Sequence, residues 1–260
     1  METGKPEYTG NEMQAYTLGG TIGAEQIVIV GTGLPLVGAV LARRLLQPSC
    51  HLIVESGLMD FCPVEIPRSV SDLRSMAHCM ATCPPYRYLG LQANELRHGR
   101  ERLIGFISGA AVDPYGNVNS TCAGEYLRPK SRFPGSGGAN GIASFCNTVI
   151  AMPHEKRRFT QTVDYITSPG WLDGPQGRRT HGLPVNRGPQ AVVTDLGVLK
   201  FHPETKRMYL DGYYPGTSIE EVRDNTGFDI DVSSARMLPP PDMAAIRLLR
   251  EIDPERIYLL

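Results

Sequence analysis

Residues 51–60 read H-L-I-V-E-S-G-L-M-D, and the rest of the chain can be interpreted outward from them. Residues 52–54 are apolar and include two β-branched side chains, a pattern typical of a buried strand. Glu55 stands where that strand should end, and Ser56 and Gly57 permit a sharp turn after it. Such a carboxylate is costly to bury unless it is paired, hydrogen-bonded or open to a cleft, which in open α/β sheets lies at the carboxyl ends of the strands. Glu55 is therefore either a reactive carboxylate or a structural one that caps a helix or forms an ion pair.

An earlier stretch, Q-I-V-I-V-G-T-G-L-P at residues 26–35, begins a βαβ unit. Residues 26–30 predict a buried strand and residues 36–46 an apolar helix that leads to the strand before Glu55. The turn between them contains Gly31 and Gly33 but lacks the third glycine of the dinucleotide fingerprint. Glu55 is also the sole candidate for the acidic residue that this fingerprint places about 20 positions further on. The two glycines thus indicate a tight turn with close backbone approach rather than a complete NAD-binding motif.

A glycine-rich stretch, P-G-S-G-G-A-N-G-I-A, occupies residues 134–143. Its glycines leave several backbone N–H groups unobstructed, Gly137 and Gly138 among them. Such a segment can cradle an anion or a developing oxyanion, or it can be a flexible surface loop. The residues alone leave both interpretations open.

The remaining pattern alternates strands and helices without an internal repeat or a linker, which favours one α/β domain over residues 1–260. A basic, helix-like segment at 95–102 is interpreted as a solvated face, and the charged connection at 154–159 as surface charge or a phosphate contact. The other expected elements are helices within 1–24 and at 71–77, 220–225 and 242–251, and strands at 86–91, 103–107, 148–152, 191–194, 198–201 and 207–210.

Composition excludes several classes of function. The 260 residues carry a net charge of −1, so nothing favours a nucleic-acid or membrane-surface partner. No apolar run approaches the roughly 20 residues of a membrane span. The polar N-terminus shows no signal-peptide pattern, and six cysteines are then expected to be reduced thiols of a cytoplasmic protein. Cys79 and Cys83 lie four apart without a second pair, so no metal site is expected.

Taken together, these stretches resemble the β subunit of family I CoA-transferases. Residues 31–35 match the glycine turn after the first strand of that family. Residues 54–60, V-E-S-G-L-M-D, look like its active-site segment, with Glu55 at the position of the catalytic glutamate. The resemblance runs from about residue 8 to residue 254, and further matching segments follow in family order at 113–119, 135–143, 167–171 and 225–229.

The resemblance implies an α/β fold with an open, mostly parallel sheet and flanking helices. It also implies a cytoplasmic hetero-oligomer in which a homologous α subunit forms the other wall of the active site. The enzyme would move CoA between an acyl-CoA and a carboxylic acid, possible acids including a dicarboxylate such as glutaconate. The CoA thioester would be a substrate, and neither a cofactor nor a metal would be needed.

In this scheme Glu55 is the nucleophile of a ping-pong reaction through a glutamyl-CoA thioester. Gly137, Gly138 and Ala139 would bind CoA and donate to the oxyanion, while Gly31, Gly33, Ser56 and Gly57 would form the turns of the substrate pocket. Arg74, Arg87 and Arg128 are candidates to pair with a second carboxylate of a diacid, or are surface residues.

Two alternatives remain: a hydrolase or decarboxylase of CoA thioesters on the same fold, and a non-catalytic binding subunit. Hydrolase and decarboxylase relatives often alter the glutamate, whereas this chain keeps it, which favours transfer.

Overall fold

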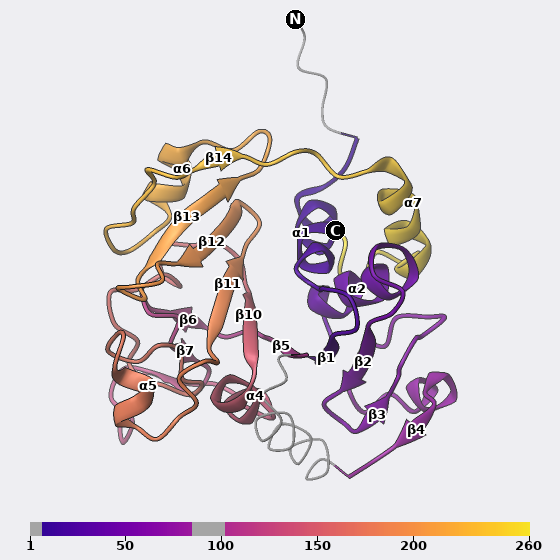
Figure 1. The fold of residues 1–260 in the computed structure, drawn as a ribbon, viewed down its shortest axis with the longest axis horizontal. Coiled ribbons are helices and arrows are strands. Elements are labelled where there is room, and N and C mark those ends of the chain that lie inside the picture. The colour runs from indigo at the N-terminus through magenta and orange to yellow at the C-terminus, as the bar shows by residue number, and fades with distance from the viewer. Residues whose placement is uncertain (1–6, 85–101) are drawn as a thin grey trace, which may run out of the picture.

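The computed structural model describes residues 7–84 and 102–260. In this part of the chain, ten strands form one mixed, open sheet (Figure 1). They are β1 (Ile27–Val30), β2 (His51–Val54), β3 (Leu58–Met59), β4 (Ala81–Thr82), β5 (Leu103–Ile107), β10 (Asn147–Ala151), β11 (Pro189–Val193), β12 (Gly197–Phe201), β13 (Met208–Tyr213) and β14 (Arg236–Met237). Their order across the sheet is β14-β13-β12-β11-β10-β5-β1-β2-β3-β4.

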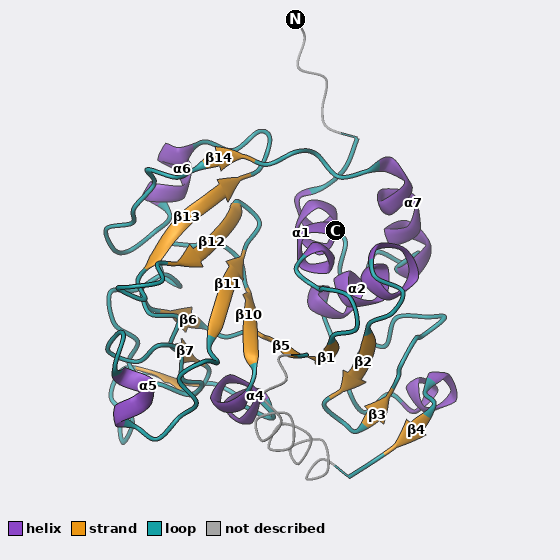
Figure 2. Cartoon of the chain, in the orientation of Figure 1, coloured by secondary structure: helices purple, strands orange, loops and turns teal. Residues whose placement is uncertain are grey.

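Helices lie on both faces of this sheet, and two small hairpins stand apart from it (Figure 2). The hairpins pair β6 (Ala111–Val112) with β7 (Val118–Asn119), and β8 (Cys122–Ala123) with β9 (Ser131–Arg132). The helices are α1 (Gly10–Gly20), α2 (Leu34–Leu41) with a π-helical continuation (Ala42–Leu46), a 3₁₀ helix (Leu73–His78), α4 (Ala139–Phe145), α5 (Gly177–Thr180), α6 (Ile219–Asp224) and α7 (Met243–Ile252).

The predicted strands and helices that fall on described residues are confirmed, with ends displaced by a few residues. The short helix predicted at 71–77 is a 3₁₀ helix. The strand predicted at 86–91 and nearly all of the basic segment at 95–102 lie outside the described residues.

The glycine-rich stretch is irregular only in its first half. From Ala139 onward the chain is helical, and Ile142 and Ala143 are buried by that helix. Burial of these apolar side chains stabilises the helix where the glycines end. The interpretation of the whole stretch as a flexible loop is therefore wrong.

The sheet is parallel at its centre and has antiparallel pairs on either side, while the edge strand β14 pairs with β13 in parallel. The strands β11, β10, β5, β1 and β2 run in parallel, as the βαβ pattern predicts. Short connections at 194–196 and 55–57 reverse the chain, so β12 and β3 add as antiparallel strands. The predicted open, mostly parallel sheet is thus confirmed, with antiparallel pairs added on either side of the parallel centre.

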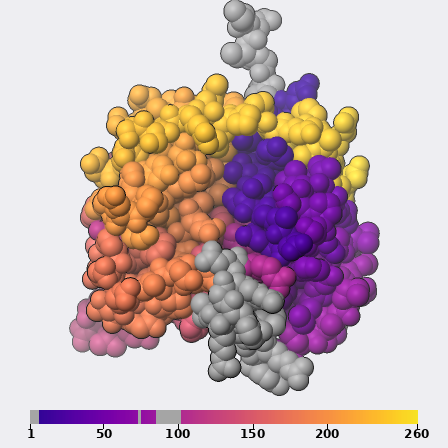
Figure 3. Space-filling view, in the orientation of Figure 1, coloured from indigo at the N-terminus to yellow at the C-terminus, as the bar shows by residue number. Residues whose placement is uncertain are grey.

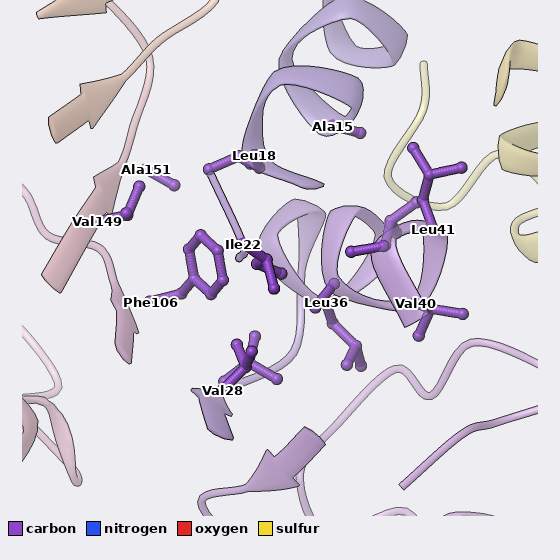
Figure 4. Packing of buried hydrophobic residues seen from close by; sticks show 14 of the residues in the cluster. Ala15, Leu18, Ile22, Val28, Leu36, Val40, Leu41, Phe106, Val149 and Ala151 are labelled. Atoms are coloured by element: carbon purple, nitrogen blue, oxygen red, sulfur yellow. The ribbon is translucent and has the colours of Figure 1, made fainter. Parts of the chain in front are cut away.

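Successive side chains of the central strands enter two different cores. Val28 and Val30 pack with α1, α2 and α7, a core that Figure 4 shows around Leu36 and Phe106. Ile29 points to the opposite face, where it joins Ile142 of α4. In the space-filling view the C-terminal segment, in yellow, runs along the top of the molecule, above the strands in orange and the N-terminal helix in indigo (Figure 3).

No helix of the described segments is both long and apolar enough to cross a membrane.

Helices α1 and α2 touch through glycines. A methyl group on Gly38 would lie 2.6 Å from the Ala15 carbonyl oxygen, and one on Gly19 would lie 2.8 Å from the Gly38 carbonyl oxygen. Backbone therefore meets backbone, and this contact holds α2 close beneath α1. Because α2 follows Gly33 directly, the contact also fixes the glycine turn at the sheet edge.

We predict that Gly38→Ala lowers the free energy of unfolding by about 1–3 kcal/mol, because the new methyl forces the helices apart. Gly20→Ala is the matched control, since nothing lies within 4 Å of a Cβ at this exposed helical position. The control should leave stability unchanged or raise it slightly. Urea unfolding of both variants measures the difference; equal values would show that the two helices separate without cost.

His154 is buried in a polar network behind β10. Its Nδ1 lies 3.1 Å from Thr194 Oγ1, and its Nε2 lies 3.0 Å from Thr226 Oγ1. The ring also stacks on Phe159, with centroids 4.1 Å apart. Burial lowers the pKa of His154 from its ordinary value of 6.5 to about 4.

This pKa shift predicts acid sensitivity. The folded-state pKa lies below the unfolded one, so the stability contribution is complete above pH 6.5 and is lost as the pH falls towards 4. The expected loss of unfolding free energy is about 2 kcal/mol between pH 7 and pH 5. Urea unfolding of His154→Gln should show a smaller loss over this interval, and the exposed His181→Gln is the control. An identical pH dependence in His154→Gln and the native protein would contradict the assignment.

Candidate active site

Glu55 lies at the carboxyl edge of the parallel strands. Val30 of β1 pairs with Val54 of β2, and the Glu55 N–H donates to the Val30 carbonyl at 3.3 Å. The Gly31 turn and Glu55 therefore leave the sheet side by side. Glu55 is half-buried, and no described residue forms an ion pair or side-chain hydrogen bond with its carboxylate. The structural interpretation, a capping or ion-paired glutamate, thus finds no partner within the described chain.

The turn after Glu55 needs glycine for two reasons. Gly57 has a φ of +95°, which is strained for residues with a side chain. Its carbonyl accepts from the Cys83 N–H at 2.8 Å, and a Cβ on Gly57 would lie only 1.9 Å from the Cys83 carbonyl oxygen. The buried Gly57 thus closes the turn, while Ser56 is exposed.

Two glycine backbones flank the Glu55 carboxylate. A methyl group on Gly31 would lie 3.8 Å from Glu55 Oε1, and one on Gly137 would lie 3.7 Å from Glu55 Oε2. The structure therefore brings together three segments that are far apart in the sequence. Gly33 does not flank the carboxylate; it is the N-cap of α2 and has a φ of +104°.

Of the three predicted N–H donors, two are available. Within the described residues, the N–H groups of Gly137 and Gly138 have no hydrogen-bond partner. The Ala139 N–H already donates to the Ser136 carbonyl at 2.9 Å. Unpaired backbone donors in a segment that reaches the carboxylate at Gly137 are suited to an oxyanion that forms there.

Side chains and backbone anchor the glycine segment to its surroundings. The Gly135 N–H donates to the Ser120 carbonyl at 2.9 Å, and Asn140 Nδ2 donates to the Thr167 carbonyl at 2.8 Å. This role of Asn140 was not predicted, because one asparagine after a run of glycines does not indicate its distant acceptor.

The segments 113–119 and 167–171, both of which match the family pattern, meet behind the glycine segment. Asn117 Oδ1 accepts from the N–H groups of Gly170 and Leu172, at 2.9 and 3.1 Å. Burial raises the pKa of Asp113, although hydrogen bonds from Asn117 and Tyr115 oppose the shift. The chain turns at Asp113, and Asn117 of this turn joins the two segments.

The other candidates lie apart from Glu55 or are not described. Residues 225–229 pack behind β10, where Thr226 contacts His154. Arg128 is exposed, the side chain of Arg74 is not described, and Arg87 lies outside the described residues. Cys79 and Cys83 are free thiols, and no group of three or more His, Cys, Asp or Glu within the described residues could hold a metal ion.

We predict that Gly57→Ala is more destabilising than Gly135→Ala. The two glycines have nearly the same φ, +95° and +93°, but nothing lies within 4 Å of a Cβ at Gly135. The strain of about 1–2 kcal/mol is thus common to both variants, and the clash with Cys83 should add about 1–3 kcal/mol at Gly57 alone. Thermal unfolding of both measures the difference, and similar melting temperatures would rule out the close Gly57–Cys83 contact.

Comparisons with known proteins agree on one family. A family model described as "Coenzyme A transferase" matches residues 11–225. The B subunit of glutaconate CoA-transferase from Acidaminococcus fermentans is 60% identical, over 97% of this chain and 95% of that relative. The B subunit of 3-oxoadipate CoA-transferase from Pseudomonas knackmussii is 35% identical, over 86% of this chain and 84% of that relative. The crystal structure of glutaconate coenzyme A-transferase from A. fermentans superposes with a TM-score of 0.95, at 59% identity and 98% coverage of both chains.

Proposed function

The chain belongs to the coenzyme A transferase family, and we propose that it supplies the nucleophile of an enzyme that transfers CoA between an acyl-CoA and a carboxylic acid. One observation carries the proposal: the Glu55 carboxylate lies between the backbones of Gly31 and Gly137, without a partner among the described residues. A carboxylate that is not engaged in a structural contact is free to attack an acyl carbonyl.

The reaction follows from the chemistry of a carboxylate nucleophile. Glu55 attacks the acyl-CoA carbonyl, the C–S bond breaks, and an acyl-glutamyl anhydride and CoA thiolate result. The thiolate then attacks the Glu55 carbonyl of the anhydride, which releases the first acid and leaves a glutamyl-CoA thioester. A second acid reverses both steps and departs as its CoA ester, which gives ping-pong kinetics. The residues alone supply the nucleophile, so the proposal needs neither a metal nor a cofactor.

The Gly137 and Gly138 N–H groups are our candidates for the oxyanion donors. Each attack creates a tetrahedral centre whose oxygen carries negative charge. Preorganised N–H groups stabilise such an oxyanion, and loss of one donor typically slows catalysis by about 10²–10³-fold. The position of the Gly137 backbone next to Glu55 Oε2, and the lack of a partner for both N–H groups among the described residues, support this role.

The acid is proposed to be a dicarboxylate, because the named substrates of both transferase relatives, glutaconate and 3-oxoadipate, are diacids. Both relatives are named as B subunits, so we propose that a homologous second subunit covers Glu55 and excludes water from the thioester. We also propose a cytoplasmic location. The proposed acyl-CoA substrate and the six free cysteines support it.

Reconstitution with the second subunit tests this function. The complex is mixed with glutaryl-CoA and acetate, and separately with acetyl-CoA and glutaconate. New acyl-CoA supports transfer. Free CoA without a new ester would indicate a hydrolase, carbon dioxide a decarboxylase, and no reaction with either pair a purely binding role. The chain alone is the control, and full turnover by it would refute the two-subunit proposal.

We predict that Glu55→Gln lowers kcat by at least about 10⁴-fold, the scale seen when a covalent nucleophile is removed. Stability should change by less than about 0.5 kcal/mol, because no described side chain pairs with Glu55. The exposed Glu204→Gln is the control for loss of a carboxylate.

Trapping gives the direct readout of the covalent intermediate. The complex is incubated with acyl-CoA, treated with borohydride or hydroxylamine, and mapped by mass spectrometry. A modified Glu55 is expected; an unmodified Glu55 in enzyme that turns over would exclude it as the nucleophile.

A further inference from the structure

We infer that Arg178 is a positioning residue for this reaction, a buried cation that holds α4 and thereby keeps the backbone of the preceding glycine segment beside Glu55. The inference rests on the proposed function, because it concerns the same oxyanion donors. Arg178 does not touch the carboxylate; it acts through the helix that follows the glycine segment.

The Arg178 guanidinium joins three separate segments of backbone. The side chain is 1% exposed. Its Nη1 donates to the carbonyls of Ala143 and Gly170, at 3.2 and 3.0 Å, and its Nη2 donates to Ser144 at 2.6 Å. Its Nε donates to the Pro184 carbonyl at 2.9 Å. Only arginine has enough N–H groups in a rigid fork to donate in so many directions at once.

The charge of Arg178 has no anionic partner in the part of the chain that the structure describes. All of its hydrogen-bond acceptors there are backbone carbonyls. Burial lowers the pKa of Arg178 to about 10, so the group remains protonated at neutral pH. Burial of a cation costs several kcal/mol even after relaxation. An apolar side chain could fill this space without that cost, but it could not link the three segments.

Arg178 holds one end of α4, and Asn140 holds the other. Ala143 and Ser144 belong to the last turn of the helix, whereas Asn140 Nδ2 bonds the Thr167 carbonyl from the first turn. Both ends are thus tied to the 167–170 segment. Gly137 lies two residues before the helix, so a shift or rotation of α4 moves the backbone that lies beside Glu55.

Apolar packing alone would hold this helix less firmly. Ile142 of α4 rests on Gly105 of β5, where a methyl group would lie 2.0 Å from Ile142 Cγ2. Gly105 allows Ile142 to approach closely, but it has no side chain that would keep Ile142 from sliding along the strand. The directional hydrogen bonds of Arg178 therefore set the position of α4 along the sheet.

The test compares Arg178→Met and Arg178→Lys with Arg179→Met, the exposed neighbour as matched control, in the reconstituted complex. A misplacement of about 1 Å can lower a rate by about 10²-fold. We expect kcat to fall 10- to 100-fold in Arg178→Met, with KM within about twofold, at a temperature at which circular dichroism shows the variant folded. Arg178→Lys should lie between Arg178→Met and the native enzyme, and Arg179→Met should match the native enzyme.

Chemical rescue separates positioning from general stability. In Arg178→Ala, guanidinium chloride at millimolar concentration should restore part of kcat, whereas ammonium chloride should not. A merely structural role predicts instead that activity follows the folded fraction and that guanidinium leaves kcat per folded molecule unchanged. That result, or native kcat in folded Arg178→Met, would overturn the inference.

Hydrogen exchange provides a readout that does not depend on the proposed reaction. In the chain by itself, the peptide covering residues 139–145 should exchange faster in Arg178→Lys than in the native chain, while the α2 peptide is unchanged. Unchanged exchange at α4 would overturn the inference even if the complex transfers CoA. Conversely, a native complex that fails to transfer CoA would refute the proposed function, whatever the exchange at α4.

Discussion

The parallel pairing of β1 with β2 is the constraint on which the site depends. Because Val30 lies beside Val54, the turn at Gly31 and the carboxylate of Glu55 must leave the sheet at the same edge. The core residues around these strands are fully buried, so a shift in register would expose them to water. The hydrophobic interior thus fixes the geometry of the candidate site, although no apolar side chain takes part in the proposed chemistry.

Glycines allow close backbone contacts at several places around the β1–β2 pair and its neighbouring helices. Gly38 brings α2 against α1, Gly57 closes the turn against Cys83, and Gly105 admits Ile142 of α4. A glycine loses more conformational freedom on folding than other residues do, so each contact lowers stability before packing compensates. In return, the backbones of Gly31 and Gly137 can reach Glu55 with no side chain between them.

Buried polar side chains brace the irregular segments that the sheet does not hold. Asn117 joins two loops through their backbone N–H groups, and Arg178 joins three segments through their carbonyls. A buried polar group is favourable only when its hydrogen bonds are made, so such braces tolerate little displacement. This sensitivity suits them to hold an irregular segment in one place.

The sequence by itself determined the βαβ unit, the open sheet and the family, because apolar periodicity and glycine turns are local and the matching segments follow in order. It also singled out Glu55, and the family resemblance assigned the glycine stretch to the oxyanion that would form there. It did not reveal the helix that starts at Ala139 or the use of the Ala139 N–H within a turn. Only the tertiary structure decided that Gly31 and Gly137 flank the carboxylate and that Arg178 has carbonyl partners in three segments. The reason is physical: strand and helix periodicity arises between neighbours in the chain, whereas these contacts join residues far apart in sequence and exist only once the sheet and its helices have packed.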